Sequence, residues 1–542
     1  MKQHEKRSIA FILTIVLLLT ACSSKAIKTN EAVKKQVLNV TVSEEIPSLD
    51  TVKTMDGTSS HVMQNIFEGL YVLDHQDKPI SGVAKSFERS EDGKRYIFHL
   101  RKDAKWSNGE AVTAHDFVYA WKRTLNPETA SQYAYMLFYL KNAKGINEGN
   151  IPIEQIGANA KDDYTLEVQL EQPVPYFLHL LALPIYLPQN EAFVTKQGKN
   201  YGLEPKYAIY NGPFALETWK HEQEFQLKKN NTYWDKGKVK LDEINFHIVK
   251  DTMTAVNLYE SGSLDRVPIN STFVDRYKDN KELHMANEPA VAMLRFNERN
   301  SFLENKKIRK SISLALNKEE FVNHFMNNGA MPAQGLIPIG YKNETDGKDF
   351  RKENGDIAVQ DLQKAKKLWE DAKKELSTES VTLEFLTFEQ DNAKRIAEYI
   401  KGELEKNLAG ITVRIKQQPF KQKLQIEQTG QYDISMVVWG PDYKDPISYL
   451  ELFTTDNPNN KMNYSNSNYD DLIQKAKDDM VLDQQKRWEV LQQAERLLLE
   501  DAAVAPLYHT GSAYIQKEYV KGIEKHQFGG VYTYKNAYLS ER

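Results

Sequence analysis

Residues 431–450, QYDISMVVWGPDYKDPISYL, indicate most clearly how this chain folds. Apolar side chains at Ile434, Met436 and Val438 follow the two-residue period of a β-strand. The strand runs out near the following tryptophan, and Asp442 comes just past its end. In lobes built from helices and strands, ligands bind beyond the ends of the strands. Asp442 is therefore the first candidate for a ligand-binding residue.

The segments around this strand have the same mixed character. Strand-like and helical stretches alternate through the second half of the chain, which predicts an α/β lobe with partly parallel strands. The expected strands are 381–388, 411–416 and 432–439, and the expected helical stretches lie near 392–406 and 468–500.

The rest of the chain also mixes helices and strands. Residues 96–100 alternate as a strand, and Asn108-Gly109 predicts a turn. Residues 113–116 have the pattern of a helix cap, and so do residues 317–320. Apolar residues four apart over 308–316 predict one face of a helix. No internal repeat is visible in the sequence.

Length and composition describe an ordinary globular protein. The 542 residues are enough for several domain-sized cores, and 41% of them are hydrophobic while 27% are charged. The formal net charge is -4, which does not suggest a nucleic-acid partner.

The first residues have the pattern of an export signal. A basic head precedes an apolar run, Ile9–Leu19, that is too short to span a bilayer but suits a signal peptide. The run ends in Leu19-Thr20-Ala21-Cys22, which resembles the signal of bacterial lipoproteins, whose cysteine carries the lipid. Cys22 is the only cysteine, and small residues before it argue against a chance buried cysteine. We expect a lipidated (palmitate-type) anchor at the extracytoplasmic face of a cell membrane.

Signatures of catalysis are absent from the sequence. It contains no phosphate-binding loop, no G-x-G-x-x-G, no G-x-S-x-G and no H-E-x-x-H. Residues 456–460 faintly resemble a calcium loop but lack its glycine. Catalytic triads scatter through a sequence, so this lowers the odds of an enzyme without excluding one. We expect no catalytic residue, no metal and no cofactor.

Four blocks of sequence, in order, resemble one family. The chain is similar to the extracytoplasmic solute-binding proteins that serve oligopeptide, dipeptide and nickel transporters, from about Leu38 to its end. The blocks are YIFHLRKDAKWSNGEAVTAHDFVYAWKR (96–123), YNGPFALETW (210–219), FLENKKIRKSISLALNKEEFV (302–322) and the segment 431–450. Most of these residues are scaffold, and we place Trp106, Asn211 and Phe214 there.

The resemblance implies a two-lobed periplasmic-binding-protein-like fold with a hinge and an extra inserted subdomain. A ligand is held between lobes that close on it. The implied parts are a signal peptide (1–21), a lipid-anchored tether (22–37), lobe I (38–69, 190–289 and 508–542), an inserted subdomain (70–189) and lobe II (290–507).

In the oligopeptide-binding branch of this family, the aspartate of the W-x-x-D-Y block pairs with the α-ammonium of the bound peptide. The resemblance gives that role to Asp442, between Trp439 and Tyr443, where closure would remove water from the carboxylate. The alternative is that Asp442 only forms a turn beside Pro441, as aspartates often do. Asp445 is the better candidate for that turn.

Other ligand residues follow from the same resemblance. Val438 to Gly440 would lie along one edge of an extended peptide, which would add to the sheet as a strand. Gly57, Thr58 and Tyr133 would approach from the other lobe. Phe420 falls where relatives carry an aromatic residue in the cleft.

Two departures from the family pattern bear on the ligand. Met436 stands where some relatives carry an arginine for a peptide carboxylate, and Val291–Leu294 replaces an aromatic stretch. We interpret these as an apolar cleft for hydrophobic peptides, which would suit the peptide-pheromone receptors of Gram-positive bacteria.

The resulting expectation is a membrane-anchored, monomeric receptor that binds oligopeptides and delivers them to the permease subunits of an ABC transporter. The alternatives are a binder of another solute such as nickel or haem, and an exported peptidase.

Overall fold

The computed structural model describes residues 35–542, apart from 54–55, 344, 389–390, 442, 456, 458, 479, 528–531 and 542. The expected signal peptide, Cys22 and nearly all of the expected tether lie outside the described residues, and so does Asp442. The chain divides into two compact units after Gln36, and the fold below is that of the second unit, Val37–Arg542.

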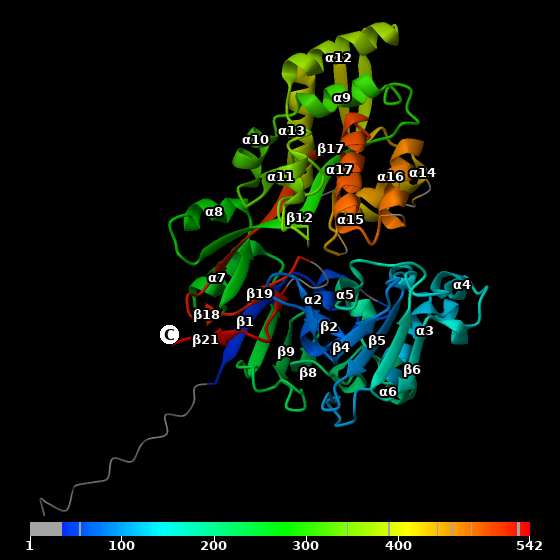
Figure 1. Ribbon diagram of the computed structural model, residues 1–542. Helices are drawn as coiled ribbons and strands as arrows, with labels where there is room; N and C mark the ends of the chain where they lie inside the picture. Colours follow the sequence, from blue (N-terminus) through cyan, green and yellow to red (C-terminus); the bar gives the residue numbers. More distant parts are fainter. Residues whose placement is uncertain are drawn as a thin grey trace, which may run out of the picture. The chain divides into compact units, whose positions relative to one another are not determined.

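One large mixed sheet organises the second unit (Figure 1). Eleven strands belong to it in the described part of the chain, and β13 (Met331–Pro332) pairs only with β17. The others follow the order β15 (Ile411–Gln418), β14 (Val381–Phe388), β16 (Ile434–Trp439), β12 (Leu283–Phe296), β17 (Val504–Gln516), β11 (Arg266–Ile269), β1 (Val37–Val42), β10 (Glu243–Ile248), β9 (Glu224–Lys229) and β8 (Phe214–Lys220).

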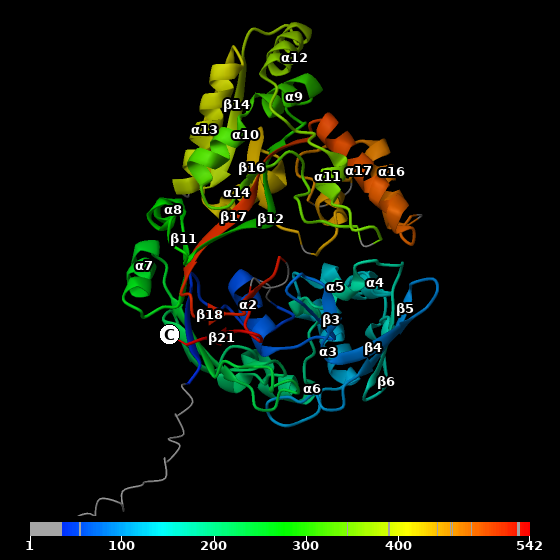
Figure 2. The same ribbon diagram turned by 60° about the vertical axis from the view of Figure 1, so that its left-hand side comes forward.

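Strands β12 and β17 join the two ends of this sheet. They pair antiparallel along most of their length, from Leu283 opposite Ile515 to Arg295 opposite Val504. The register shifts between Asn287 and Val291, which marks a bulge. Figure 2 shows the two strands side by side, leading from the strands around β16 to β11. The expected lobe boundaries at 289/290 and 507/508 both fall inside these strands.

The predicted βαβ pattern of the second half is confirmed. Strand β14 pairs parallel to both β15 and β16. Helices α13 (Asp391–Asn407) and α14 (Phe420–Thr429) make the two connections. The expected single helical stretch at 468–500 is wrong in one respect: it is two helices, α16 (Ser467–Lys477) and α17 (Gln484–Glu500), and Asp483 caps the second by accepting from Lys486 N.

A second sheet lies within residues 70–189. Its four antiparallel strands follow the order β4 (Ala84–Arg89), β5 (Arg95–Leu100), β7 (Thr165–Gln169) and β6 (Ala158–Asp162). Helix α3 (Ala114–Leu125) begins with the predicted capping box of Thr113 and Asp116. The residues assigned to the scaffold, Trp106, Asn211 and Phe214, are all buried.

The remaining elements are short. The helices are α2 (Gly57–Ile66), α4 (Ala143–Asn147), α5 (Phe177–Leu180), α6 (Glu191–Gln197), α7 (Thr252–Glu260), α8 (Ser271–Tyr277), α9 (Lys306–Ala315), α10 (Lys318–Phe321), α11 (Phe350–Asn354), α12 (Leu362–Glu375) and α15 (Ile447–Leu450). Two-stranded pairs are formed by β2 (Tyr71–Leu73) with β3 (Pro79–Ser81), β18 (Val520–Lys521) with β21 (Tyr538–Leu539), and β19 (Glu524–Lys525) with β20 (Tyr532–Thr533). In the described part of the chain, no helix is long and apolar enough to cross a membrane.

Lys318, at the start of α10, is a buried lysine whose charge is not matched by an acid. Its side chain is 4% exposed, and its Nζ donates to Ala333 O at 3.0 Å and Ala358 O at 2.6 Å. Among the described residues, Lys318 has no ion-pair partner. Burial lowers the pKa of Lys318 from 10.5 to about 7. A neutral amine has two N–H groups, which match the two carbonyls.

Because the folded pKa of Lys318 is below the unfolded pKa, the unfolded chain binds more protons between pH 7 and 10.5, and stability rises with pH there. At 1.36 kcal/mol per pKa unit, the shift from 10.5 to about 7 accounts for about 5 kcal/mol of that rise. We expect the Lys318→Met variant to lose most of the increase in unfolding free energy between pH 7 and 9, measured by urea titration. Lys307→Met removes a half-exposed lysine of α9 that pairs with Glu375, and it should keep the parental slope between pH 7 and 9. If the unfolding free energy of Lys318→Met rose with pH as steeply as that of the parent, Lys318 would be charged in the folded protein.

Candidate functional site

Strand β16 has one edge that is only partly paired. On one side it pairs with β12 over its whole length, from Ile434 opposite Phe296 to Trp439 opposite Val291. On the other side, β14 pairs only with Ile434 and Ser435. Among the described residues, the edge of β16 from Met436 onward therefore has no strand partner. Such an edge presents backbone N–H and C=O groups to an added strand.

The predicted ligand residues at this edge lie together in sequence and in space. Val438 is 48% exposed, which is unusual for a valine within a sheet. Trp439 is half-buried, and its Nε1 donates to Ser448 O at 3.1 Å. Gly440 is exposed. The end of β16 thus offers a backbone edge, an exposed valine and a fixed indole.

Tyr443 connects this block to the inserted segment 70–189. Its ring stacks on that of Tyr176, with centroids 4.1 Å apart and planes at 12°. Its hydroxyl donates to Glu451 Oε1 at 2.9 Å, and the hydroxyl of Tyr139 lies 3.4 Å away. Burial raises the pKa of Tyr443 well above 10, so the phenol stays neutral. Tyr443 therefore joins the segment after β16 to residues of the segment 70–189, and Tyr176 covers one face of its ring.

Asp445 forms the expected turn and also a buried ion pair. Its Oδ1 accepts from Ile447 N at 2.9 Å, which is the turn interaction. Both carboxylate oxygens accept from Arg487 at 2.8 Å, and both residues are buried. Burial alone would lower the pKa of Arg487, but the Asp445 carboxylate outweighs it and raises that pKa. Sequence reasoning found the turn and missed the ion pair.

Other predicted positions are placed away from the edge. Met436 is 2% exposed, and its side chain packs in a hydrophobic core with Leu294 and Ile434. Val291 to Leu294 are fully buried on β12 as well. The apolar character of these positions is explained by core packing, which removes their support for an apolar cleft. Phe420 begins α14, and its side chain is outside the described set.

The other predicted ligand residues, Gly57, Thr58 and Tyr133, lie at the start of α2 and before a short 3-10 helix. Gly57 is exposed and Thr58 half-buried in the first turn, which Asp56 caps by accepting from Ser59 N at 2.9 Å. Tyr133 is half-buried beside Tyr135, with ring centroids 6.4 Å apart. Among the described residues, no side-chain hydrogen bond or ring contact joins Gly57, Thr58 or Tyr133 to the end of β16, so only the β16 residues form a contiguous group.

A cavity of about 580 Å³ lies beside the β16 block, where segment 70–189 meets residues of the second half. Lys444 crosses this contact, because its Nζ donates to Gln76 O at 3.0 Å, and the buried Asp445–Arg487 pair lies on the second-half side. No group of three or more potential metal ligands occurs among the described residues. The wall of the cavity is formed by residues of the segments 76–78, 175–179, 340–347, 444–446 and 484–488.

The sequence matches one family model over residues 78–461, that of the bacterial extracellular solute-binding proteins, family 5. The match covers most of the chain. This chain belongs to that family. The family 5 resemblance expected from the four sequence blocks is therefore confirmed.

Relatives of this family 5 chain agree on the fold. The substrate-binding domain of an oligopeptide ABC transporter from Bacillus anthracis strain Ames is 49% identical, with a TM-score of 0.80 over 94% of this chain and 99% of that chain. The pheromone receptor PrgZ, whose structure was determined together with its mode of peptide binding, is 33% identical to this chain. Its TM-score is 0.80, and the match covers 94% of this chain and 100% of PrgZ. The dipeptide-binding protein DppE of Bacillus subtilis strain 168 is 35% identical over 91% of this chain and 90% of its own. The predicted α/β, two-lobed binding-protein fold is confirmed.

The family 5 site contains residues that the sequence did not reveal. Tyr139, Tyr176 and Glu451 surround Tyr443, and Arg487 holds Asp445. Tyr176 and Tyr443 are 267 positions apart, and neither lies in a motif that points to the other. Only a structure brings them together.

Removing the charge of Asp445 should destabilise the protein. Asp445→Asn leaves the Arg487 cation buried without its carboxylate, which typically costs about 3–5 kcal/mol. Urea unfolding should show this loss, and adding Arg487→Met to the variant should restore part of it. Glu224→Gln, at an exposed pair with Lys220, is the matched control and should cost less than about 1 kcal/mol. Equal costs at the two sites would mean that the buried pair is solvated.

Proposed function

We propose that this chain is a lipid-anchored extracytoplasmic receptor that binds oligopeptides between two lobes and delivers them to the permease of an ABC importer. The observation that carries the proposal is the free edge of β16 from Met436 to Trp439, in a chain of family 5. Relatives named for oligopeptide, dipeptide and pheromone binding support the same ligand class. We propose a binding protein without catalytic activity, acting as a monomer.

The β16 edge suits a ligand that is recognised through its backbone. A peptide repeats the same amide at every residue, so a receptor for many sequences gains affinity from main-chain hydrogen bonds. An extended peptide beside Val438–Gly440 would continue the sheet where β14 stops. Side chains of such a strand point alternately to the two faces and can differ freely. General oligopeptide binding follows from this geometry.

Lobe closure completes the proposed site. We take lobe I as 38–69, 190–289 and 508–542, the inserted subdomain as 70–189 and lobe II as 290–507, which places the hinge in β12 and β17. Tyr443 on lobe II and Tyr176 on the inserted subdomain are then contacts across the closing surfaces. Gly57, Thr58 and Tyr133 would face the ligand from the opposite side. Closure of this kind sequesters a ligand from water.

The proposed ligands include signalling peptides, and the similarity to the pheromone receptor PrgZ supports this. Incubation with a peptide mixture separates the function classes. A peptide receptor returns its ligand unchanged, whereas a peptidase returns fragments and a nickel or haem binder returns metal or colour.

We propose that Asp442 pairs with the free α-ammonium of the peptide. It stands between Pro441, which is buried, and Tyr443, which is buried against Tyr176. A peptide ammonium that loses water in such surroundings requires a carboxylate partner. The ordinary turn interaction of this segment is already made by Asp445, which leaves Asp442 without need for that role.

The charge of Asp442 should therefore control affinity. Asp442→Asn keeps the shape and should weaken binding by about 2–5 kcal/mol, or roughly 30-fold or more. An acetylated peptide removes the same charge from the other side, so mutant and parent should bind it alike. Calorimetric titration with free and acetylated forms of one peptide measures the cycle.

Asp356→Asn, an exposed loop residue of lobe II, is the matched control for net charge and should bind like the parent. Asp445 does not serve as a control because its loss perturbs the buried pair with Arg487. Unchanged binding of the free peptide by Asp442→Asn would assign Asp442 to the turn.

The proposed anchor rests on Cys22. Two acyl chains on one cysteine give stable membrane attachment, where one chain is marginal. Cys22→Ala should move the protein from the membrane fraction to the soluble fraction, and Ser23→Ala, beside it, should leave the distribution unchanged. Retention of Cys22→Ala in membranes after a salt wash would refute the lipid anchor.

A further inference from the structure

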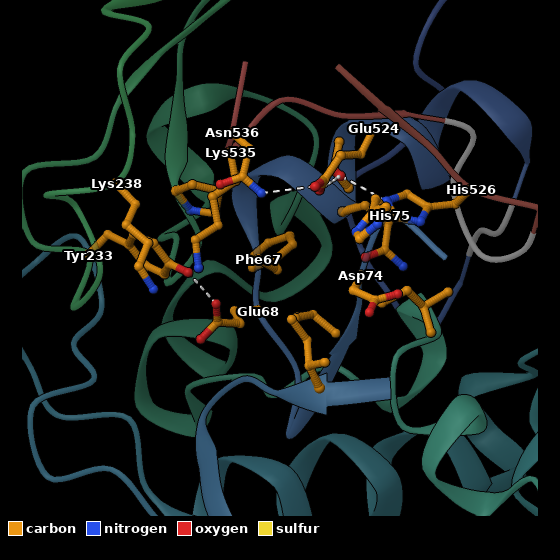
Figure 3. Close-up of a pocket in the computed structure, with 16 residues that line it drawn as sticks. Phe67, Glu68, Asp74, His75, Tyr233, Lys238, Glu524, His526, Lys535 and Asn536 are labelled. Atoms are coloured by element: carbon orange, nitrogen blue, oxygen red, sulfur yellow. Dashed lines mark hydrogen bonds between the residues drawn. The ribbon is translucent and has the colours of Figure 1, made fainter. Parts of the chain in front are cut away.

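A second cavity, of about 250 Å³, is lined by residues of the segments 64–80, 213–238 and 524–536 (Figure 3). Its walls come from the end of α2, the β2–β3 hairpin and the C-terminal segment around β19 and β20. At about 30 Å³ per water molecule, it has room for roughly eight waters or a small organic molecule. None of the residues predicted for peptide binding lines it.

Glu68 occupies one wall of this cavity. The residue is 3% exposed, and its carboxylate accepts from the hydroxyl of Tyr233 and from Trp234 Nε1 at 2.6 Å. Burial raises the pKa of Glu68, and the positive charge of nearby Lys535 partly opposes that rise. Neutral groups thus supply both hydrogen bonds to this carboxylate, and no ion pair to it occurs among the described residues.

Glu524 provides a second carboxylate at another side of the cavity. It accepts from Asn536 Nδ2 at 3.0 Å and from Thr533 Oγ1 at 3.4 Å, which are again neutral donors. The described ion pairs do not include Glu524. In the view of Figure 3, the Phe67 ring lies between Glu68 and Glu524.

The lysines of the cavity are already engaged. Lys535 Nζ lies 2.7 Å and Lys238 Nζ 3.2 Å from the same oxygen of Asp235, which is not a wall residue. Lys535 also lies over the rings of Tyr233 and Trp234, at 5.3 and 5.2 Å from their centroids. The two carboxylates therefore lack a close cation, although cations are present nearby.

Two other polar wall residues, His526 and Asp74, are engaged elsewhere. His526 contacts Asp77 through Nδ1 at 3.1 Å and Thr533 through Nε2 at 2.8 Å. Asp74 is used in its own turn, where it accepts from Gln76 N and Lys78 N. Apolar side chains complete the lining: Phe67, Val72, Leu73, Ile80 and Pro213.

We infer that this cavity binds an aliphatic cation, with an ammonium or guanidinium group against Glu524 and its carbon chain on the apolar wall toward Glu68. Carboxylates that hold only neutral donors gain most from a cationic partner in a partly desolvated site. The cation is either a free amine or the basic side chain of a longer peptide. The inference concerns a site separate from the proposed peptide ammonium site at Asp442.

The test uses 1,5-diaminopentane as the probe, titrated calorimetrically into the full chain. 1,5-Pentanediol and glutarate have the same length but no charge or the opposite charge, and neither should bind. Glu524→Gln should weaken diaminopentane binding about tenfold or more, since it removes the partner charge. Glu518→Gln, an exposed carboxylate of the same C-terminal segment, should bind like the parent.

Two further arms separate the sources and the sites. Tight binding of trilysine that Glu524→Gln weakens, with trialanine unaffected, assigns the cation to a peptide side chain. Diaminopentane binding that persists with trialanine bound assigns it to a free amine. Asp442→Asn should leave diaminopentane binding intact even where it abolishes peptide binding. Three results would overturn the inference. The parent and Glu524→Gln could bind diaminopentane equally, the parent could fail to bind diaminopentane, or Asp442→Asn could lose diaminopentane binding.

Discussion

The antiparallel pairing of β12 with β17 is the constraint on which the rest of this structure depends. At 14 and 13 residues, these strands are more than twice the usual length, and the large sheet is continuous only through them. The bulge at Asn287–Val291 interrupts their ladder and leaves backbone groups to be satisfied elsewhere. Tyr449 donates to Pro289 O at 2.6 Å, and Thr510 donates to Ala290 O at 3.3 Å.

This pairing also explains why the free edge lies where it does. Strand β16 is held against β12 along its full length, so the position of Trp439 is fixed by Val291 on the other strand. Tyr449, which supports the bulge, lies just after the Tyr443–Asp445 turn. A change of angle at the bulge therefore acts on the sheet and on the turn together. In the proposed receptor, bending at this one point of the sheet would couple ligand contact to closure.

Much of the fold is readable from the sequence because the signals are local. Residues 381–388 alternate and form β14, and the capping pattern at Thr113 begins α3 one residue later. These elements follow from periods and caps within a few residues. The break between α16 and α17 was missed because the cap at Asp483 is a single side chain inside a long helical pattern.

The site is less predictable because its contacts join distant residues. Alternation places Met436 on one face of β16, but the sequence alone does not say that this face is covered by a core. Tyr176 and Arg487 reach the turn from segments far away in the chain. A family resemblance transfers the position of Asp442, whereas the partners that hold its neighbours appear only in three dimensions.

Charge pairing separates the residues that hold this fold from those that are free to act. Two buried acids in the scaffold have full cationic partners: Glu495 accepts two bonds from Arg351 at 2.7 and 2.9 Å, and Asp50 accepts two from Arg123 at 2.6 and 2.8 Å. Breaking such pairs leaves an uncompensated charge, so they are fixed by stability. Glu68 and Glu524 hold only neutral donors, which is a weaker state for a carboxylate in a low dielectric. Asp116 also holds only neutral donors, but it caps α3. Glu68 and Glu524 instead line a cavity, where a ligand can supply the missing charge.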